Sequence, residues 1–241
     1  MFSRYCLSVQ SSSYTTGLYR VPLEAARLAV ADDYFTVAEI FPGEAVFFIG
    51  TGEFRKADLG PYMEMYIGFY TENRERETRP TQEDNLLEFS TQESKMFMWK
   101  NWLTTADANE RMKVAGSTVF RVGAIERQDG DGETTFAMEH PTEGSIRFTA
   151  PTQGAVEQSD LTLERTHYGR LHDEPSRLHL YMNVDTMVTS PGQGRLELSG
   201  AVADECAALE IPDQPLVSIW IPEMNFKMGK PLLLPKQPPP A

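Results

Sequence analysis

The sequence has little cysteine and no long apolar segment. Its two cysteines, Cys6 and Cys206, are too few for a disulfide framework or a cysteine-based metal cage. No run of about 18 apolar residues, the length needed to cross a bilayer, occurs in the chain. The first residues also lack the apolar core and cleavage site of a secretory signal. We therefore expect a cytoplasmic protein in a reducing compartment, without a membrane partner.

Positive charge is also scarce. The chain has 22 Lys and Arg residues against 35 Asp and Glu residues, which gives a formal net charge of -13. Binding to nucleic acid needs clustered Lys and Arg that displace the counterions of the phosphates. One Arg-rich segment, residues 74–79, carries Glu75 and Glu77 between its arginines and is typical of a solvated loop. We expect no nucleic-acid partner.

The motifs of several large enzyme classes are missing. The sequence contains no Gly-x-Ser-x-Gly elbow, no P-loop and no Gly-x-Gly-x-x-Gly after a strand, which argues against hydrolase, kinase and dinucleotide-binding sites. A His-Glu-x-x-His pattern is missing too, and no cysteine lies near the pair His167 and His172. We interpret these histidines as polar loop residues, and we expect neither a metal ion nor a cofactor.

Short runs of β-branched and aromatic residues, bounded by Gly, Pro and Asp, recur along the chain and are typical of an antiparallel sandwich or barrel. They predict strands at residues 45–50, 63–70, 117–125, 134–138, 145–149, 161–166, 178–188, 194–198 and 216–221. Asp-Gly pairs at residues 129–132 predict a hairpin turn, because they tolerate the positive φ that such turns require. Apolar residues at helical spacing predict short helices at residues 22–29, 107–115 and 201–209.

The composition favours one folded unit. With 241 residues, of which 41% are hydrophobic, the chain can bury a sizeable core. We expect a single domain over residues 1–236 of the mainly β (α+β) class. The Pro-rich tail at residues 237–241 cannot propagate a helix or the interior of a sheet, so we expect it to be extended.

A carboxylate stands at the start of one apolar strand. The turn residues 58–61 lead to Glu64, which is followed by the apolar run 65–70. A glutamate among buried residues is costly unless it is paired or functional, so Glu64 is a candidate site residue. Arg20 immediately precedes the helix predicted at residues 22–29. Its guanidinium either clamps a carboxylate or enolate, or makes a structural ion pair, for example with Glu64.

Several segments together resemble the acetoacetate decarboxylase superfamily. They are Tyr19-Arg20 before the first helix, the Leu-Gly-Pro-Tyr-Met-Glu segment at residues 59–64, and the closing segments 182–185 and 194–198. The resemblance implies a cone-like antiparallel β-barrel with an apolar pocket in its core, assembled into homo-oligomers. It also implies that Glu64 is the active-site glutamate.

One feature of that family is missing. Its decarboxylases carry an aromatic-Pro-Lys motif whose lysine forms a Schiff base with a β-keto acid. The corresponding segment here, residues 115–125, has no Pro-Lys. It carries Arg121, whose guanidinium stays protonated and cannot act as an amine nucleophile, although it can hold an oxyanion. Lys113, on a predicted helix, and Lys100, between two tryptophans, remain as alternative lysines.

The resemblance and the missing lysine together predict an enzyme that acts without a Schiff base. We expect acid-base catalysis on a small, largely apolar carbonyl or polyketide-like compound of secondary metabolism, with Glu64 as general acid or base and Arg20 or Arg121 stabilising an oxyanion. The reaction would be a lyase-type dehydration, an isomerisation or a cyclisation. Aromatic residues are expected to line the pocket, namely Tyr19, Tyr62, Tyr66, Phe48, Trp99 and Phe120. Two alternatives remain open: a β-keto acid decarboxylase that uses Lys113 or Lys100, and a small-molecule-binding barrel without turnover.

Overall fold

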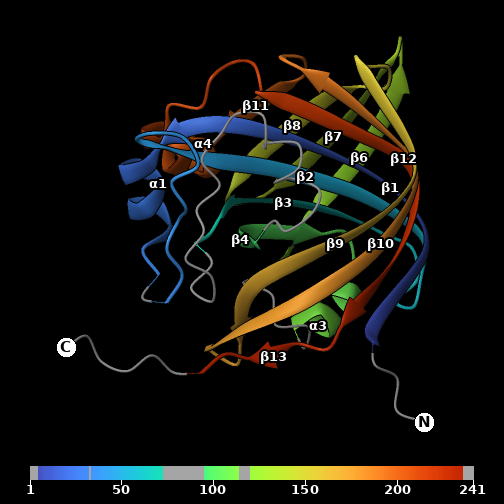
Figure 1. Cartoon of the computed structure of the whole chain (residues 1–241), viewed down its shortest axis with the longest axis horizontal. Helices are drawn as coiled ribbons and strands as arrows, with labels where there is room; N and C mark the ends of the chain where they lie inside the picture. The colour runs from blue at the N-terminus through green and yellow to red at the C-terminus, as the bar shows by residue number, and fades with distance from the viewer. Residues whose placement is uncertain (1–4, 33, 73–94, 114–119, 236–241) are drawn as a thin grey trace.

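The computed structural model describes residues 5–32, 34–72, 95–113 and 120–235. Most of these residues lie in strands, which form a 9-stranded sheet and a 4-stranded sheet. Figure 1 shows the larger sheet curling round on itself, with the smaller sheet as a separate layer on one side of it.

The larger sheet closes into a ring. Its order is β12-β1-β2-β3-β4-β9-β10-β13, and β12 also pairs with β10. Within the ring β4 and β9 run parallel, whereas the other neighbouring strands run antiparallel. β5 pairs with β4 off this path. The strand bounds are β1 (Tyr5–Pro22), β2 (Glu44–Ala57), β3 (Tyr62–Tyr70), β4 (Lys95–Leu103), β5 (Phe120–Val122), β9 (Val156–Leu171), β10 (Glu174–Pro191), β12 (Val217–Gly229) and β13 (Leu232–Leu233).

The smaller sheet is antiparallel and has the order β11-β8-β7-β6. Its strands are β6 (Ala124–Gly130), β7 (Glu133–His140), β8 (Gly144–Pro151) and β11 (Arg195–Ser199). The turn between β6 and β7 consists of Asp131 and Gly132, with φ of 51° and 79°. The hairpin predicted from the Asp-Gly pairs is confirmed.

The helices are short and close to their predicted positions. They are α1 (Leu23–Val30), α3 (Ala106–Lys113) and α4 (Ala201–Cys206), and a 3-10 turn, η2 (Ala207–Leu209), continues α4. α3 begins earlier than expected, because the Oγ1 of Thr105 accepts the N–H of Ala108 at 3.2 Å. Asp107 is therefore inside the helix, where its carboxylate lies 3.3 Å from the Nε of Arg111.

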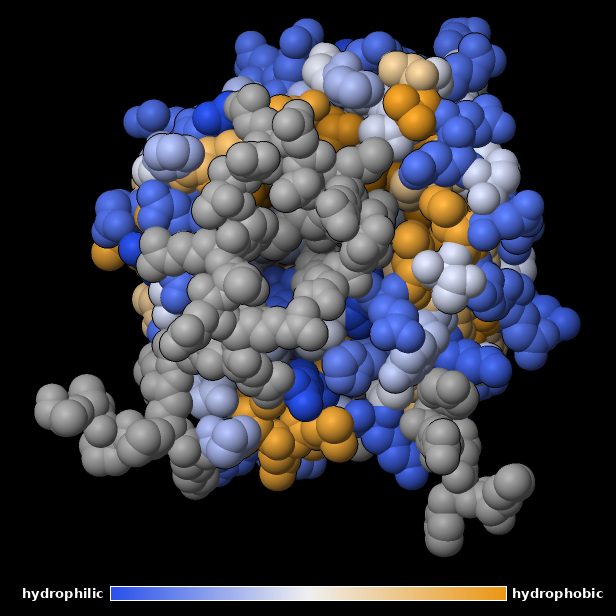
Figure 2. Space-filling view, in the orientation of Figure 1, coloured by the Kyte–Doolittle hydropathy of each residue, from blue (hydrophilic) through white to orange (hydrophobic). Residues whose placement is uncertain are grey.

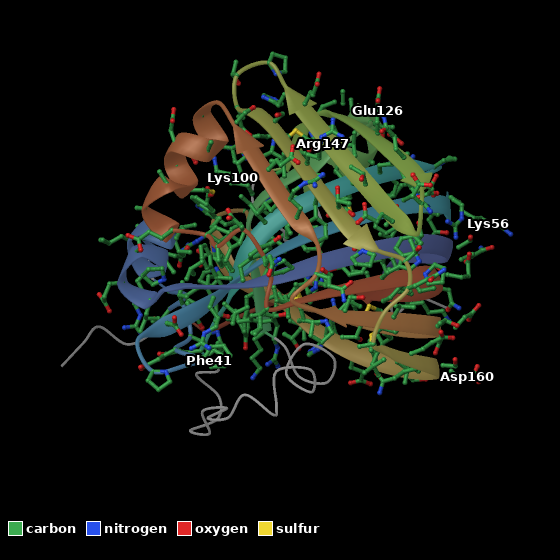
Figure 3. All side chains as sticks on the ribbon, turned by 90° about the horizontal axis from the view of Figure 1, so that it is seen from above. Phe41, Lys56, Lys100, Glu126, Arg147 and Asp160 are labelled. Atoms are coloured by element: carbon green, nitrogen blue, oxygen red, sulfur yellow. The ribbon has the colours of Figure 1, made fainter. Side chains whose placement is uncertain are left out.

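Alternation along the ring strands produces two cores. Leu18 points into the ring, whereas Tyr19 points outward, towards the smaller sheet. The smaller sheet contributes the fully buried Phe136 and Phe148 to this outer core. Figure 3 views the two layers from above, with Glu126 and Arg147 on the smaller sheet. The inner core therefore combines ring residues with Ala108 and Met112 of α3 and contains no residue of the smaller sheet, whereas the outer core joins the two sheets.

The predicted fold class is confirmed, but one predicted strand was wrong. Residues 117–125 do not form a single strand, and residues 117–119 lie outside the described residues. β5 ends at Val122 and β6 begins at Ala124, because the N–H of Gly123 donates to the carbonyl of Leu103 at 3.0 Å. The chain passes at this point from the ring to the smaller sheet.

The surface is largely hydrophilic on the face that Figure 2 shows, with hydrophobic residues in small groups. One such group lies at the lower edge, over β13, where Leu232 and Leu233 are exposed. In the described part of the chain, no helix is both long enough and apolar enough to cross a membrane.

Candidate active site

The ring contains a cavity that α3 covers in part. Its empty volume, which includes the open space at its mouth, is about 680 Å³. Most lining side chains are apolar, and methionine is frequent among them: Met98, Met112, Met182, Met224 and Met228. The polar lining residues are Tyr14, Tyr62, Glu64, Tyr66, Arg165 and His167. Flexible methionines let such a wall adapt to ligands of different shape.

Glu64 is the acid among the lining residues. It lies on β3, where alternation places it on the same face as Tyr62 and Tyr66, and it is only 5% exposed. Burial raises the pKa of Glu64 to about 7, and a hydrogen bond from Asn101 partly opposes this rise. Near neutral pH the carboxyl group therefore exists in both its protonated and its ionised form.

Asn101 holds the Glu64 carboxyl group from the neighbouring strand β4. Its Nδ2 donates to Oε1 of Glu64 at 2.5 Å. A bulge at Trp99 makes this possible, because it shifts the register of β4 against β3 by one residue. In a regular strand Met98 and Asn101 would point to opposite faces, whereas here the Asn101 amide lies 3.5 Å from the Met98 sulfur.

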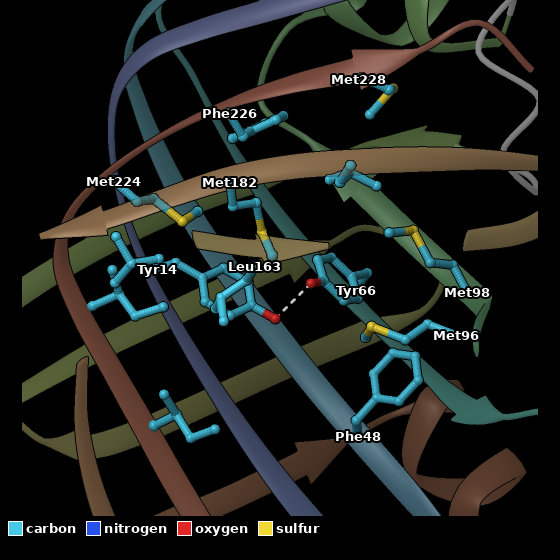
Figure 4. Packing of buried hydrophobic residues seen from close by; sticks show 14 of the residues in the cluster. Tyr14, Phe48, Tyr66, Met96, Met98, Leu163, Met182, Met224, Phe226 and Met228 are labelled. Atoms are coloured by element: carbon cyan, nitrogen blue, oxygen red, sulfur yellow. Dashed lines mark hydrogen bonds between the residues drawn. The ribbon is translucent and has the colours of Figure 1, made fainter. Parts of the chain in front are cut away.

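A pair of tyrosines forms another part of the wall. The hydroxyl oxygens of Tyr14, on β1, and Tyr66, on β3, lie 2.6 Å apart (Figure 4). Both side chains are buried, and their rings stack at a centroid distance of 6.4 Å. Gly50 on the intervening strand β2 leaves room for the Tyr66 ring, since a Cβ there would lie 2.4 Å from the Tyr66 Cζ.

β9 supplies a cation and a neutral imidazole. Arg165 is 6% exposed, and its Cζ lies 5.9 Å from the centroid of the Tyr14 ring. Burial acts to lower the pKa of Arg165, but the phenol groups around it outweigh that effect and raise the pKa. Burial, and then the charge of Arg165, lower the pKa of His167 to about 3, so this histidine is uncharged at neutral pH.

The interpretation of the histidine pair as loop residues was wrong for His167, which lies on β9, whereas His172 lies in the turn after that strand. Among the described residues, no group of three or more His, Cys, Asp and Glu side chains is placed to hold a metal ion.

Three residues proposed from the sequence meet in the cavity, namely Glu64, Tyr62 and Tyr66. The Tyr62 ring stacks on Phe54 at a centroid distance of 4.5 Å, and its hydroxyl has no hydrogen-bond partner among the described residues. Phe48 also points into the ring, but it packs edge-on against the Tyr66 ring and does not line the cavity.

The two arginines proposed as oxyanion stabilisers do not line the cavity, which corrects the sequence-based assignment. Arg20 pairs with Glu44, to which its Nε donates at 2.7 Å, and its guanidinium lies over the Phe41 ring. Arg121 pairs with Glu143, which also accepts the indole N–H of a tryptophan. Both guanidinium groups thus serve ion pairs outside the ring interior.

The remaining aromatic candidates are also elsewhere. Tyr19 is fully buried in the outer core, and Trp99 packs on Phe69 at the bulge, also outside the cavity. The backbone of Phe120 pairs with that of Asn101, but its side chain is outside the described residues.

The candidate lysines are likewise not in the described cavity wall. Lys100 is buried on the face of β4 opposite Asn101, where it pairs with Glu205 and lies 5.3 Å from the Trp99 ring centroid. The side chain of Lys113, at the end of α3, is outside the described residues. Because it lies on this opposite face of β4, Lys100 cannot reach a ligand in the cavity.

Comparison with solved structures identifies the fold. An acetoacetate decarboxylase from Legionella pneumophila matches with a TM-score of 0.65 and 10% identity, over 97% of this chain and 90% of that one. The enduracididine biosynthesis enzyme MppR, complexed with pyruvate, matches with a TM-score of 0.62 and 14% identity, over 98% and 92%. An acetoacetate decarboxylase-like enzyme from Sphingomonas wittichii RW1 matches with a TM-score of 0.57 and 12% identity, over 98% and 95%. No family model and no curated protein matches the sequence.

Proposed function

We propose that this chain, which has the acetoacetate decarboxylase fold, is an enzyme that transforms a small apolar carbonyl compound by acid-base catalysis. Glu64 is its proton-transfer group. The observation that carries the proposal is the position of Glu64: a carboxyl group with a pKa of about 7, held by Asn101 in the wall of a mainly apolar cavity. A general acid or base works best when its pKa is near the working pH.

The proposal includes no Schiff base. The segment that carries the lysine motif in decarboxylases of this fold has no Pro-Lys here, and no lysine is among the described lining residues. An arginine cannot replace the lysine, because its guanidinium stays protonated. Proton transfer to and from carbon or oxygen is the chemistry that Glu64 can perform alone. An isomerisation, a lyase-type dehydration or a cyclisation needs no more than this.

The wall of the cavity supports the choice of substrate class. Its side chains are mostly apolar and methionine-rich, which favours an apolar molecule and tolerates variation in its shape. A protein of the same fold, MppR, is known in complex with pyruvate and with the condensation product of pyruvate and imidazole 4-carboxaldehyde. Both the fold and the lining residues are therefore compatible with a carbonyl compound.

Proton abstraction can be tested before the substrate is known. In deuterium oxide, the protein should exchange the α-protons of one or more apolar ketones from a panel such as 2-octanone, cyclohexanone and acetophenone, followed by NMR. The rate should rise with pH through about 7, as Glu64 loses its proton. Glu64→Gln should slow the exchange by about 10²- to 10⁴-fold.

The matched control is Glu126→Gln, which changes an exposed glutamate on the smaller sheet and should leave the exchange rate unchanged. A wild-type protein that exchanges none of these ketones, or an exchange that Glu64→Gln leaves intact, contradicts the proposal.

Borohydride trapping distinguishes the proposed acid-base enzyme from the Schiff-base decarboxylase alternative. After incubation with acetoacetate and borohydride, mass spectrometry should find every lysine unmodified. A label on Lys113 would instead show a relocated Schiff-base lysine. A binding barrel without turnover would bind ketones, yet Glu64→Gln would change only their affinity.

A further inference from the structure

Arg165 is a buried cation without a carboxylate partner in the described part of the chain. It lines the cavity at 6% exposure, and among the described residues no carboxylate pairs with it. Its Nε has no hydrogen-bond partner within residues 5–32, 34–72, 95–113 and 120–235. A guanidinium that is removed from water without an anionic partner costs several kcal/mol. An anionic oxygen that enters or forms in the cavity would offset this cost.

The groups next to Arg165 are tyrosine side chains rather than carboxylates. Its Cζ lies 5.9 Å from the Tyr14 ring centroid, and the Tyr14 hydroxyl lies 2.6 Å from that of Tyr66. In a pair of hydroxyl groups, one O–H donates to the other oxygen, and the second O–H is left to donate elsewhere. Among the described residues no acceptor takes this second proton. The pair, which Figure 4 shows, thus offers one free phenolic donor, and the guanidinium of Arg165 lies beside the Tyr14 ring.

The side chain of Tyr66 separates the positive part of the cavity from Glu64, the proton-transfer group. Tyr66 and Glu64 are two residues apart on β3 and point into the same cavity. The charges of both Arg165 and Glu64 influence the pKa of Tyr66, which burial raises most strongly. Tyr66 therefore lies between the cation and the carboxyl group. A small molecule that contacts Tyr66 can reach both of them.

We propose that Arg165 and the Tyr14–Tyr66 pair form an oxyanion site that receives the carbonyl oxygen of the substrate while Glu64 moves a proton on the neighbouring carbon. The inference rests on the proposed function and narrows its substrate class to enolisable ketones and aldehydes. No residue of this site was assigned to oxyanion stabilisation from the sequence, which pointed to Arg20 and Arg121 instead.

The step balances without a further reactant. The Glu64 carboxylate takes a proton from the carbon next to the carbonyl group, and the electron pair of that C–H bond becomes the carbon-carbon double bond. The π pair of the carbonyl group moves onto its oxygen, which becomes negative. The phenolic O–H donates to this oxygen, and Arg165 neutralises its charge. Glu64 then returns the proton to the same carbon or to a conjugated one.

Binding of 4-nitrophenol tests the site without a known substrate, because its absorption spectrum shows whether the bound molecule is a phenol or a phenolate. At a pH just below its solution pKa, wild-type protein should bind it as the phenolate. The affinity for the ionised probe should exceed that for 4-nitroanisole, which cannot ionise, by about tenfold or more, as expected for a hydrogen bond to a charged group.

Variants assign the effect to residues. Arg165→Met should lower the affinity for nitrophenolate by about tenfold or more, and Tyr14→Phe should lower it less, because a donor is lost but the charge remains. Arg20→Met removes an arginine that does not line the cavity and should leave the affinity unchanged. If Arg165→Met does not fold, the spectrum of the probe bound to the wild type and the comparison with 4-nitroanisole still test whether the site binds an anion.

The inference is overturned if the bound probe is the neutral phenol, if 4-nitroanisole binds as well as nitrophenolate, or if folded Arg165→Met keeps the wild-type affinity. These outcomes leave the role of Glu64 untouched, since that role is read from ketone exchange. The converse pair of results is ketone exchange that is independent of Glu64 and nitrophenolate binding that depends on Arg165. That pair of results would contradict the proposed function and support the anion site.

Discussion

Glu64 makes the stability of the folded chain depend on pH. Burial raises its pKa from 4.5 to about 7, so between these values the folded state binds more protons than the unfolded state. The stabilisation is fully present below pH 4.5, and it is lost as the pH rises to about 7. In the wild type, Glu64 should therefore lower the free energy of unfolding by about 3 kcal/mol between pH 4.5 and 7. In the Glu64→Gln variant this decrease should be absent. Urea unfolding at a series of pH values measures it.

His167 also contributes to the pH dependence of stability, but with the opposite sign, so its effect must be separated from that of Glu64. Its pKa is lowered from 6.5 to about 3, so its contribution is lost as the pH falls from 6.5 to about 3. Between pH 4.5 and 6.5 the two slopes oppose each other in the wild type. A Glu64→Gln variant with the wild-type slope between pH 5 and 7 would show that the carboxyl group titrates normally.

Single residues were predicted from the sequence only where a local signal was strong. Glu64 was found because a charged residue interrupts an apolar strand. Arg165 was missed, although it shares its face of β9 with Leu163, because a lone arginine in a polar stretch resembles a solvent-facing residue. Asn101 was hidden by the bulge, which changes the face on which a residue falls and leaves no mark in the residue pattern.

At the level of elements, the contact between β3 and β4 depends on Gly68 at the bulge. A Cβ on Gly68 would lie 2.1 Å from the carbonyl oxygen of Phe97 and 2.7 Å from the Phe48 ring. Backbone atoms of a central strand cannot move away easily, so Gly68→Ala should lower the free energy of unfolding by about 2 kcal/mol or more. Urea unfolding measures the loss.

The control for that substitution is Gly130→Ala on β6, where nothing lies within 4 Å of the added Cβ. Its unfolding free energy should stay close to that of the wild type. Equal values for the two variants would mean that the two strands separate at the bulge without cost.

The strand with the weakest sequence signal is β1. Serine and threonine, which are not typical of a buried strand, are frequent in it. In the structure these hydroxyls are satisfied: Thr15 donates to the carbonyl of Ile219 at 2.8 Å, and Thr16 donates to that of Ile49 at 2.6 Å. Partners more than 30 residues away in the sequence cannot be inferred from local composition.

For the molecule as a whole, the two cores should respond differently to substitution. Phe148 is fully buried between the sheets, and Phe148→Ala should cost about 3–5 kcal/mol of unfolding free energy. Met182 lines the cavity, and the volume-conserving change Met182→Leu should cost less than about 1.5 kcal/mol. Denaturant unfolding of both variants, with m-values compared, tests the difference.

If Met182→Leu costs as much unfolding free energy as Phe148→Ala, the cavity wall is packed as rigidly as the outer core.

The fold itself was predicted through the family resemblance, since strand patterns alone do not reveal how a sheet closes. The parallel contact between β4 and β9 in particular joins segments that only the tertiary structure brings together.

β1 pairs with β12 from Tyr5 opposite Gly229 to Leu18 opposite Val217. During synthesis on the ribosome, β1 therefore lacks its second neighbour until residues 217–229 have been made. Until then it presents an open edge, which is a template for pairing with other nascent chains. Shortening the chain before residue 217 would leave that edge permanently unpaired. Expression of such a fragment should give aggregates rather than a smaller barrel.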